Sequence, residues 1–280
     1  SIPPYHFGPI FFPTLRQQGY YENIKWEETS MFNVGLDFGF LSGRLSGSID
    51  YYTKKTKDLL AVISVPAGSN FTNRILTNVG NIENKGIEFV INATPVRNAN
   101  FTWQTIFNIT WNKSTITNLS KILDTTSIGN ETGGIGGGVG NLVQIHTVGY
   151  NPFAFYVYKQ VYDANGVPLE GLFQDINGDG DLDLEDKYRY KSPDPKVFLG
   201  FTSQFTYKEW SAAFTLRAQF GNYMYNNFHS NNGSYVNFRY TGYLGNVASN
   251  VLETNWEGTD SRRYWSDYFV ENASFLRMDN

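Results

Sequence analysis

The 280-residue sequence contains no cysteine, which excludes disulfide bonds, zinc–thiolate sites and thiol nucleophiles together. Charge is also scarce, because only 17% of the residues are Asp, Glu, Lys or Arg, and the net charge of −4 gives no general attraction to nucleic acid or to anionic lipid. No run approaches the roughly 18 consecutive apolar residues of a transmembrane helix. Aromatic residues are abundant instead: 22 Phe, 19 Tyr and 6 Trp recur on the apolar faces described next.

Three pairs of segments alternate apolar and polar residues with a period of two, which predicts three β-hairpins. They span 32–40 with 45–52 around a turn at Ser42-Gly43, 87–94 with 101–112 around Arg97 to Asn100, and 197–207 with 210–220 around Lys208-Glu209. In the first pair, Val34 and Leu36 alternate with Gly35 and Asp37. Strands of about nine or ten residues exceed the usual length in soluble sheets and match what is needed to cross a bilayer at a tilt.

Long connections separate the hairpins, and all of them must leave the strands at the same end. They cover 53–84, 113–196 and 221–272; the first is expected to be irregular, and no structure is assigned to the lead at 1–22. Short periplasmic turns and long extracellular loops are typical of bacterial outer-membrane barrels. Five aromatic residues near strand ends fit the interfacial girdles of such a barrel: Tyr51, Trp103, Trp111, Tyr207 and Trp210.

These patterns predict an all-β fold, an antiparallel transmembrane β-barrel with long extracellular loops and with polar strand faces lining its lumen. Asn92, Asn108 and Asn112 are expected in that lining. The alternative is a soluble β protein, since the strands of a β-sandwich also alternate. Such a protein would be extracellular and stabilised by calcium, and it would bind carbohydrate through exposed Trp and Tyr.

An ordered series of short motifs runs along nearly the whole chain. They are Asn23-Ile-Lys25-Trp26-Glu27, Asn33-Val-Gly35, Arg44, Asp50-Tyr51-Tyr52, Lys54-Lys-Thr56-Lys-Asp58-Leu-Leu60, Asn78-Val-Gly80, Asn84-Lys-Gly86-Ile-Glu88, Trp103, Phe155-Tyr-Val-Tyr158, Asp175-Ile-Asn-Gly-Asp-Gly180, Gly200-Phe-Thr202 and Ser274-Phe-Leu-Arg277. In this order they resemble the C-terminal half of the SusC-like TonB-dependent transporters of Bacteroidetes. Each motif alone is weak, and the succession carries the resemblance.

The resemblance implies a large barrel of the bacterial outer membrane that is plugged from inside and surrounded by outer-membrane lipid. It implies import of oligosaccharides, or of peptides, with energy relayed by TonB and with a SusD-like lipoprotein as the lid. Residues 1–280 would then be the C-terminal portion of the barrel. The plug, the TonB contact and the first strands would belong to the remainder of the same chain, before Ser1, and a final strand would follow Asn280. No residue distinguishes glycan from peptide.

Catalytic patterns are weak in this sequence, and we expect that the protein is not an enzyme. His6, His146 and His229 are isolated, with neither metal-ligand spacing nor a partnered nucleophile, and are expected to be exposed loop residues. The glycine tract from Gly133 to Gly140 lacks the following Lys-Ser/Thr of a phosphate loop and is expected to be a mobile loop.

One segment has the spacing of an EF-hand calcium loop, with oxygen ligands at positions 1, 3, 5, 9 and 12 and Gly180 at the sharp turn. The ligand candidates are Asp175, Asn177, Asp179, Asp181 through its backbone carbonyl, Asp183 and Asp186. Asp at position 12 is shorter than the usual Glu, and no long helices flank the loop. The sequence therefore predicts a structural Ca²⁺, against the alternative of an ion-free acidic turn.

Overall fold

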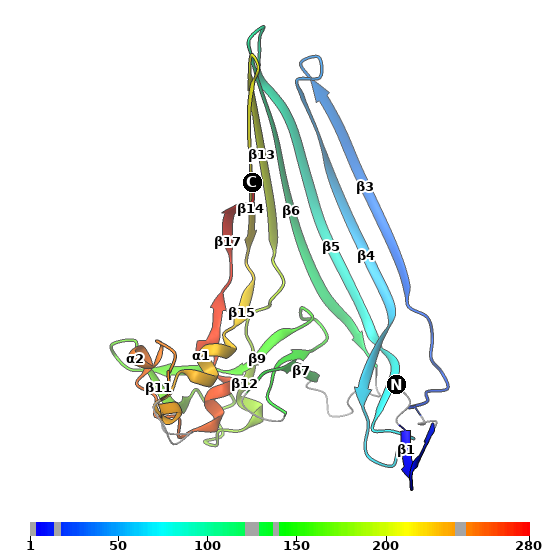
Figure 1. Cartoon of the computed structure of the whole chain (residues 1–280), viewed down its shortest axis with the longest axis vertical. Helices are drawn as coiled ribbons and strands as arrows, with labels where there is room; N and C mark the ends of the chain where they lie inside the picture. Colours follow the sequence, from blue (N-terminus) through cyan, green and yellow to red (C-terminus); the bar gives the residue numbers. More distant parts are fainter. Residues whose placement is uncertain (1–3, 14–17, 121–128, 137–139, 239–244) are drawn as a thin grey trace.

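The computed structural model describes residues 4–13, 18–120, 129–136, 140–238 and 245–280. Its main feature is a tall, curved antiparallel sheet of seven strands in the order β17-β14-β13-β6-β5-β4-β3 (Figure 1). The strands are β3 (Glu28–Phe40), β4 (Leu45–Ser64), β5 (Arg74–Arg97), β6 (Phe101–Leu119), β13 (Val197–Tyr207), β14 (Trp210–Phe220) and β17 (Phe275–Met278). Within the described residues the edge strands β3 and β17 do not pair with each other, so the sheet is an open section of wall.

The remaining elements lie at the opposite end of the sheet from the tight turns (Figure 1). The strands there are β1 (Pro4–Phe7), β2 (Ile10–Pro13), β7 (Asn130–Gly134), β8 (Leu142–His146), β9 (Ala154–Tyr158), β10 (Gln160–Tyr162), β11 (Pro168–Phe173), β12 (Lys187–Arg189), β15 (Tyr223–Tyr225) and β16 (Val270–Asn272). The helices are α1 (Asn227–Asn232), α2 (Val251–Thr254), η1 (Leu184–Asp186), η2 (Tyr235–Phe238), η3 (Ser261–Trp265) and η4 (Asp267–Phe269). Among the described residues no helix is long and apolar enough to cross a membrane.

The three predicted hairpins are confirmed, and their turns lie together at one end of the sheet (Figure 1). Strand β6 pairs directly and antiparallel with β13, although 77 residues lie between Leu119 at the end of β6 and Val197 at the start of β13. The described part of that connection adds no strand to the large sheet, because β7, β8, β9 and β12 form a sheet of their own. All long connections therefore leave from the same end, as predicted.

The strands extend further from the turns than the sequence pattern predicts. The stretch 53–84, expected to be irregular, is mostly paired strand, from Lys54 opposite Asn84 to Ser64 opposite Arg74. Strand β6 likewise continues to Leu119. The alternation is interrupted there by register shifts, between Thr56 and Leu60 where β4 pairs with β5 and between Asn81 and Ile82 where β5 pairs with β6. The lead contains the paired strands β1 and β2, which the sequence did not assign.

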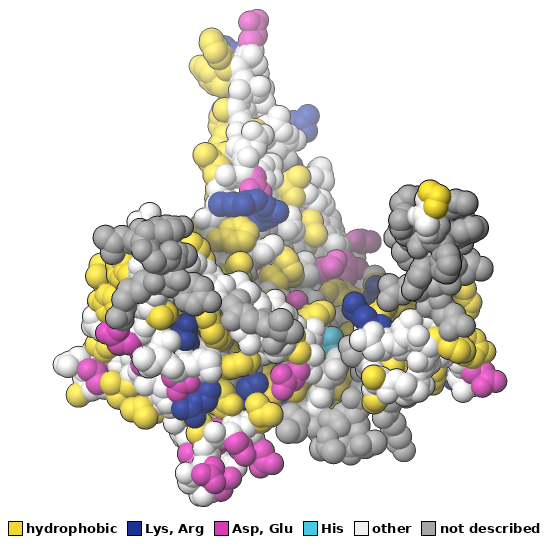
Figure 2. Space-filling view, turned by 60° about the horizontal axis from the view of Figure 1, so that its bottom comes forward, with side chains coloured by type: hydrophobic (Ala, Val, Ile, Leu, Met, Phe, Trp, Pro, Cys, Tyr) yellow, Lys and Arg dark blue, Asp and Glu magenta, His cyan; other side chains and the backbone are white. Residues whose placement is uncertain are grey.

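The sheet has an apolar face and a polar face. Because apolar residues pair with apolar residues in the strand register, each face is continuous across the long strands. Val34, Tyr51, Ile87, Trp111 and Val197 lie in one row of the apolar face. Large side chains on this face are exposed, including 65% for Leu36 and 80% for Trp210. In Figure 2 the rising sheet carries few charged side chains, whereas many gather at the loop end. An exposed apolar face of this size requires an apolar surrounding.

Candidate functional site

The polar face of the sheet is the first candidate surface. The predicted lining residues Asn92, Asn108 and Asn112 all lie on it. One row crosses five strands through Ser46, Asn92, Ile106, Thr202 and Thr215. The face offers mainly amides and hydroxyls, which donate and accept hydrogen bonds, and it also carries the carboxylates of Asp50 and Glu88, which are register partners.

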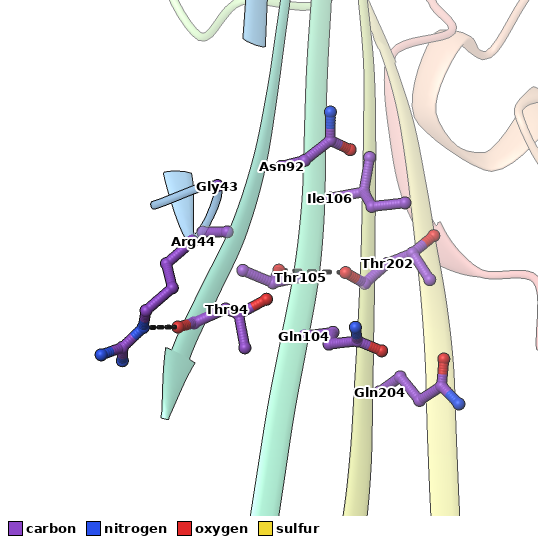
Figure 3. A pocket seen from close by; sticks show the side chains of 10 residues that line it. Gly43, Arg44, Asn92, Thr94, Gln104, Thr105, Ile106, Thr202 and Gln204 are labelled. Carbon is purple, nitrogen blue, oxygen red and sulfur yellow. Dashed lines mark hydrogen bonds between the residues drawn. The ribbon is translucent and has the colours of Figure 1, made fainter. Parts of the chain in front are cut away.

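Near the turns, this face contains a hollow of about 230 Å³ (Figure 3). It is lined by side chains from β5, β6 and β13 and by the residues that follow the first turn: Gly43, Arg44, Asn92, Ala93, Thr94, Gln104, Thr105, Ile106, Thr202 and Gln204. Arg44 is the single charged residue of that lining, and its guanidinium donates to the carbonyl oxygens of Thr94 at 3.2 Å and Pro95 at 2.7 Å.

The amide side chains of the hollow are available to a ligand or to another part of the protein. Asn92, Gln104 and Gln204 have no side-chain hydrogen bond within the described residues, whereas the Thr105 hydroxyl donates to the Thr202 carbonyl at 3.0 Å. Figure 3 shows the amide side chains of Asn92, Gln104 and Gln204 on neighbouring strands along the same face. The arrangement can bind hydroxyl or amide groups, and it contains no acid–base pair suited to catalysis.

Further from the turns, Tyr52 of β4 lies across Gly86 of β5. Its hydroxyl donates to the Asn112 side-chain oxygen on β6 at 3.1 Å, so one side chain ties three strands together. A Cβ at position 86 would lie 2.4 Å from the Tyr52 ring, which is closer than any real contact. Glycine is therefore required for the tyrosine to lie flat against the wall. The sequence analysis missed this pair, since it becomes visible only when the register places Tyr52 opposite Gly86.

At the loop end, the two longest connections pack into one folded unit, here called the loop body (129–196 and 223–272, described residues). Its core includes Val143, Phe155, Val157 and Val270. Trp256 is 1% exposed, and its indole N–H donates to the Pro168 carbonyl at 2.8 Å. The connections predicted to be extracellular loops are thus well-packed structure.

Two half-buried carboxylates, those of Glu170 and Asp267, link separate segments of the loop body through hydrogen bonds. Glu170 of β11 accepts hydrogen bonds from the backbone N–H groups of Glu257 at 2.7 Å, Gly258 at 2.8 Å and Thr259 at 2.7 Å. This row of N–H groups forms an anion-binding nest that the chain fills with its own side chain.

Asp267 is the second carboxylate. It accepts from the Gln160 N–H at 3.0 Å and from the Tyr188 hydroxyl at 2.6 Å, which joins the two connections. Burial raises the pKa of the Asp267 carboxyl, and these two hydrogen bonds act in the opposite direction. Burial, together with the hydrogen bond to Asp267, also raises the pKa of Tyr188.

The predicted calcium loop lies in the loop body, and backbone N–H groups occupy most of its carboxylate oxygens. Asp175 accepts from Gly178 at 2.6 Å and from Gly180 at 2.9 Å. The side-chain oxygen of Asn177 accepts from the Asp179 N–H at 3.1 Å. Asp179 accepts from the Asp181 N–H at 2.9 Å.

The last two candidate ligands hold the end of this loop. Asp183 accepts from the Glu185 N–H at 2.7 Å, and Asp186 is buried, accepting from Ile176 at 2.7 Å and from Asp183 at 3.0 Å. The hydrogen bonds from Asp183 and Ile176 lower the pKa of Asp186. In the described part of the chain, no group of three or more His, Asp or Glu side chains converges closely enough to hold a metal ion. Calcium stays a prediction, and binding would require these carboxylates to turn inward.

The expectation that the histidines are loop residues is wrong for all three, because each lies in a strand or a helix. His146 lies at the end of β8, half-buried with its ring against Phe153, and burial lowers its pKa. His229 lies in α1 with its Nδ1 3.3 Å from a Glu271 oxygen. His6 is in β1.

The glycine tract is also more ordered than expected where it is described. Gly133 and Gly134 end β7, and Ile135 packs against the core of the loop body. Positions 137–139 lie outside the described residues.

Comparison with known proteins gives a family match and several relatives. The family model for the TonB dependent receptor-like β-barrel matches residues 7–166. The chain is 44% identical over 282 residues to the TonB-dependent receptor SusC of Bacteroides thetaiotaomicron, covering 99% of this chain and 28% of that protein. It is 32% identical over 228 residues to the TonB-dependent receptor P26 of Formosa agariphila, covering 77% of this chain and 23% of that protein. The chain thus spans less than a third of the length of these relatives.

Solved structures of the same architecture are also similar. The RagAB peptide transporter matches with a TM-score of 0.70 and 22% identity, over 98% of this chain and 30% of that chain. The RagAB peptide importer in its open-open state matches with a TM-score of 0.69 and 21% identity, over 99% of this chain and 30% of that chain. At these identities the likeness establishes the fold.

Proposed function

Because the chain belongs to the family of TonB-dependent receptor β-barrels, which are outer-membrane proteins, we propose that it forms wall and extracellular loops of an active nutrient importer. The resemblance to SusC-like proteins found in the sequence is confirmed, as is the antiparallel barrel fold. The soluble alternative is wrong, because the apolar face belongs in the outer membrane. The plug and the remaining strands would come from the remainder of the same transporter chain.

The observation that carries the proposal is the two-faced sheet, whose polar face leads from the loop body to the turn end. A wall that is aromatic outside and hydrophilic inside provides a passage for hydrophilic oligomers. The amides of Asn92, Gln104 and Gln204 can bind the hydroxyl groups of a glycan and equally the amide groups of a peptide. We propose oligosaccharides as the substrates, with peptides as the alternative. The partners would be TonB, which supplies energy through the remainder of the chain, and a SusD-like lipoprotein above the loop body.

Uptake in cells tests the import proposal. A strain lacking the intact gene is compared with the same strain carrying the full-length gene, using labelled oligosaccharides and, separately, labelled oligopeptides. Import that requires both the gene and TonB is expected for oligosaccharides. Uptake that persists without TonB would mean a passive pore, and uptake of peptides alone would reverse the substrate assignment.

The orientation follows from the same architecture: the turns at Gly43, Asn98 and Lys208 would be periplasmic and the loop body extracellular. Cysteines introduced one at a time into a cysteine-free form of the full-length protein test this; residues 1–280 contribute no cysteine of their own. A membrane-impermeant thiol reagent added to intact cells is expected to label Gly178→Cys and not Gly43→Cys. The reverse pattern would invert the orientation.

We also propose that the loop 175–186 binds a structural Ca²⁺ when the ion is supplied. The donor set of carboxylate and amide oxygens is the chemistry that this hard cation prefers. Calorimetric titration of the chelator-treated full-length protein is compared with that of the Asp175→Ala, Asp179→Ala double variant. Equal heats from the two proteins would end the calcium assignment.

A further inference from the structure

The lysines at the loop-side boundary of the apolar face have no role in the import described above. Lys85 of β5 and Lys113 of β6 are direct register partners on this face. Like charges placed directly opposite in an antiparallel pair are destabilising, since their Cβ atoms lie only about 5 Å apart. The salt bridge from Lys85 to Glu83 offsets part of this repulsion, and an anion held between the two ammonium groups would offset the rest.

The depth of the pair relative to the membrane points to the kind of anion. On β6 the apolar face runs from Phe101 near the turns to Trp111, about ten residues, which spans about 25 Å along the membrane normal for a strand tilted by about 40°. This matches the height of the apolar band of outer-membrane barrels. Lys85 and Lys113 follow the Ile87 and Trp111 row by two residues, about 7 Å further along the strands. They therefore lie at the depth of lipid headgroups.

The surrounding charges leave the site positive. Glu83 binds Lys85 at 2.7 Å and Lys55 at 3.4 Å, so it neutralises one of these two lysines. The Lys55 and Lys85 side chains remain 58% and 47% exposed. Lys57 is the register partner of Glu28 and adds no net charge.

A hollow of about 380 Å³ adjoins Lys113, where β6 and the segment leading into β13 separate. It is lined by Trp111, Lys113, Ser114, Ser192, Asp194 and Lys196, among others. Asp194 is the one acid of that lining. Counted together, the cluster and the lining of the hollow contain four lysines (Lys55, Lys85, Lys113 and Lys196) and two acids (Glu83 and Asp194).

We infer that Lys85, Lys113 and this hollow bind the phosphate-bearing headgroup of a membrane lipid at the loop-side leaflet. Lysine is a suitable point charge for phosphate, and Trp111 borders the acyl region. The chain as a whole carries a charge of −4, so the attraction is local and not a property of the net charge. The inference rests on the membrane position of the apolar face and, for the choice of leaflet, on the proposed orientation.

The test measures lipid retained by the full-length transporter. The protein is reconstituted in nanodiscs of phosphatidylcholine with a minor fraction of phosphatidylglycerol, released, and analysed by native mass spectrometry. The wild-type protein is expected to retain phosphatidylglycerol in preference to phosphatidylcholine. The variant Lys85→Gln, Lys113→Gln should lose about fivefold in this preference for each lysine, or about 25-fold in total.

The matched control is Lys54→Gln, Lys25→Gln, which removes two lysines while leaving Lys85, Lys113 and the hollow intact; Lys54 neighbours Lys55 in β4 on the polar face. This variant should retain the wild-type preference. Equal retention by all three proteins would overturn the inference, and so would binding of inorganic phosphate that depends on Lys85 and Lys113 without any lipid preference. Oligosaccharide uptake, measured on the same proteins in cells, reports on the import proposal separately and is expected to be unchanged.

Discussion

Removing the Asp267 carboxylate is expected to loosen the loop body while leaving the sheet intact. Asp267 joins the two long connections through the Gln160 N–H and the Tyr188 hydroxyl. Gln160 is 5% exposed, so its N–H group cannot easily be rehydrated when the acceptor is lost. Asp267→Ala therefore leaves two donors without partners inside the folded unit.

The size of the effect follows from the two lost hydrogen bonds. A buried donor left unsatisfied costs about 1–3 kcal/mol, and two of them, with some water entering beside Tyr188, cost about 2–4 kcal/mol. Since about 1.4 kcal/mol corresponds to a factor of ten, local opening should become about 30- to 1,000-fold more frequent. Asp267→Asn keeps one acceptor oxygen and should show about half of this free-energy change.

Hydrogen exchange of the full-length transporter, followed by mass spectrometry, measures this opening. Faster exchange is expected in the segments 154–162 and 266–270, with β5 and β6 as internal references. Glu185→Gln serves as the control, since it removes an exposed carboxylate of the same loop body. The reasoning is refuted if Asp267→Ala leaves both segments as protected as in the wild-type protein.

Two more predictions concern the wall and the acidic loop. Gly86→Ala should displace Tyr52 and its hydrogen bond to Asn112 and lower the thermal stability of the barrel in a heat-modifiability gel, whereas Gly39→Ala, with open space around it, should not. Equal stability of the two variants would contradict the tyrosine–glycine contact. Because the folded-state pKa of Asp186 is lowered, its stabilisation of the loop 175–186 is present above the unfolded value of about 4 and is lost as pH falls through the folded value. Hydrogen exchange of this loop should therefore accelerate in acid, and Asp186→Asn should give fast exchange already at neutral pH; a loop insensitive to both changes would contradict this role.

The parts of the fold that could be predicted from the sequence are those where one face meets lipid. There Val34 and Leu36 point to the lipid side and alternate with Gly35 and Asp37 on the polar side, so residue type alone predicts which face each side chain is on. From Lys54 onward a run of lysines and the register shifts between Thr56 and Leu60 interrupt the period, although the strand continues to Ser64. Pairing in this region depends on cross-strand partners, which a single segment does not reveal.

The loop body escaped prediction for a different reason. Strand β9 is buried along its whole length, so it reads as a short apolar run without any period. Its packing partners include Val270, and the buried Trp256 is tied to Pro168, far along the chain in each case. Glu170 and Asp267 are ordinary acidic residues in the sequence, and only the fold places them opposite backbone N–H groups. Contacts over such separations leave no local signal.

The extensions of β4 and β5 beyond the apolar face are held by hydrogen bonds from side chains to the backbone of neighbouring segments, and we call such a side chain a clamp. Asn78 is the main one: its side-chain N–H donates to the carbonyls of Lys25 at 2.9 Å and Asp58 at 2.6 Å, and its oxygen accepts from the Lys25 N–H at 2.8 Å. From Lys85 to Arg74 the strand rises about 25 Å above the headgroup region at the same tilt. In the proposed importer and the proposed orientation, a substrate arriving from outside would meet the extensions and the loop body well before the hollow near the turns. Residues that select the substrate should be sought first in the loop body, where packed side chains such as Trp256 hold the exposed surface in a fixed shape.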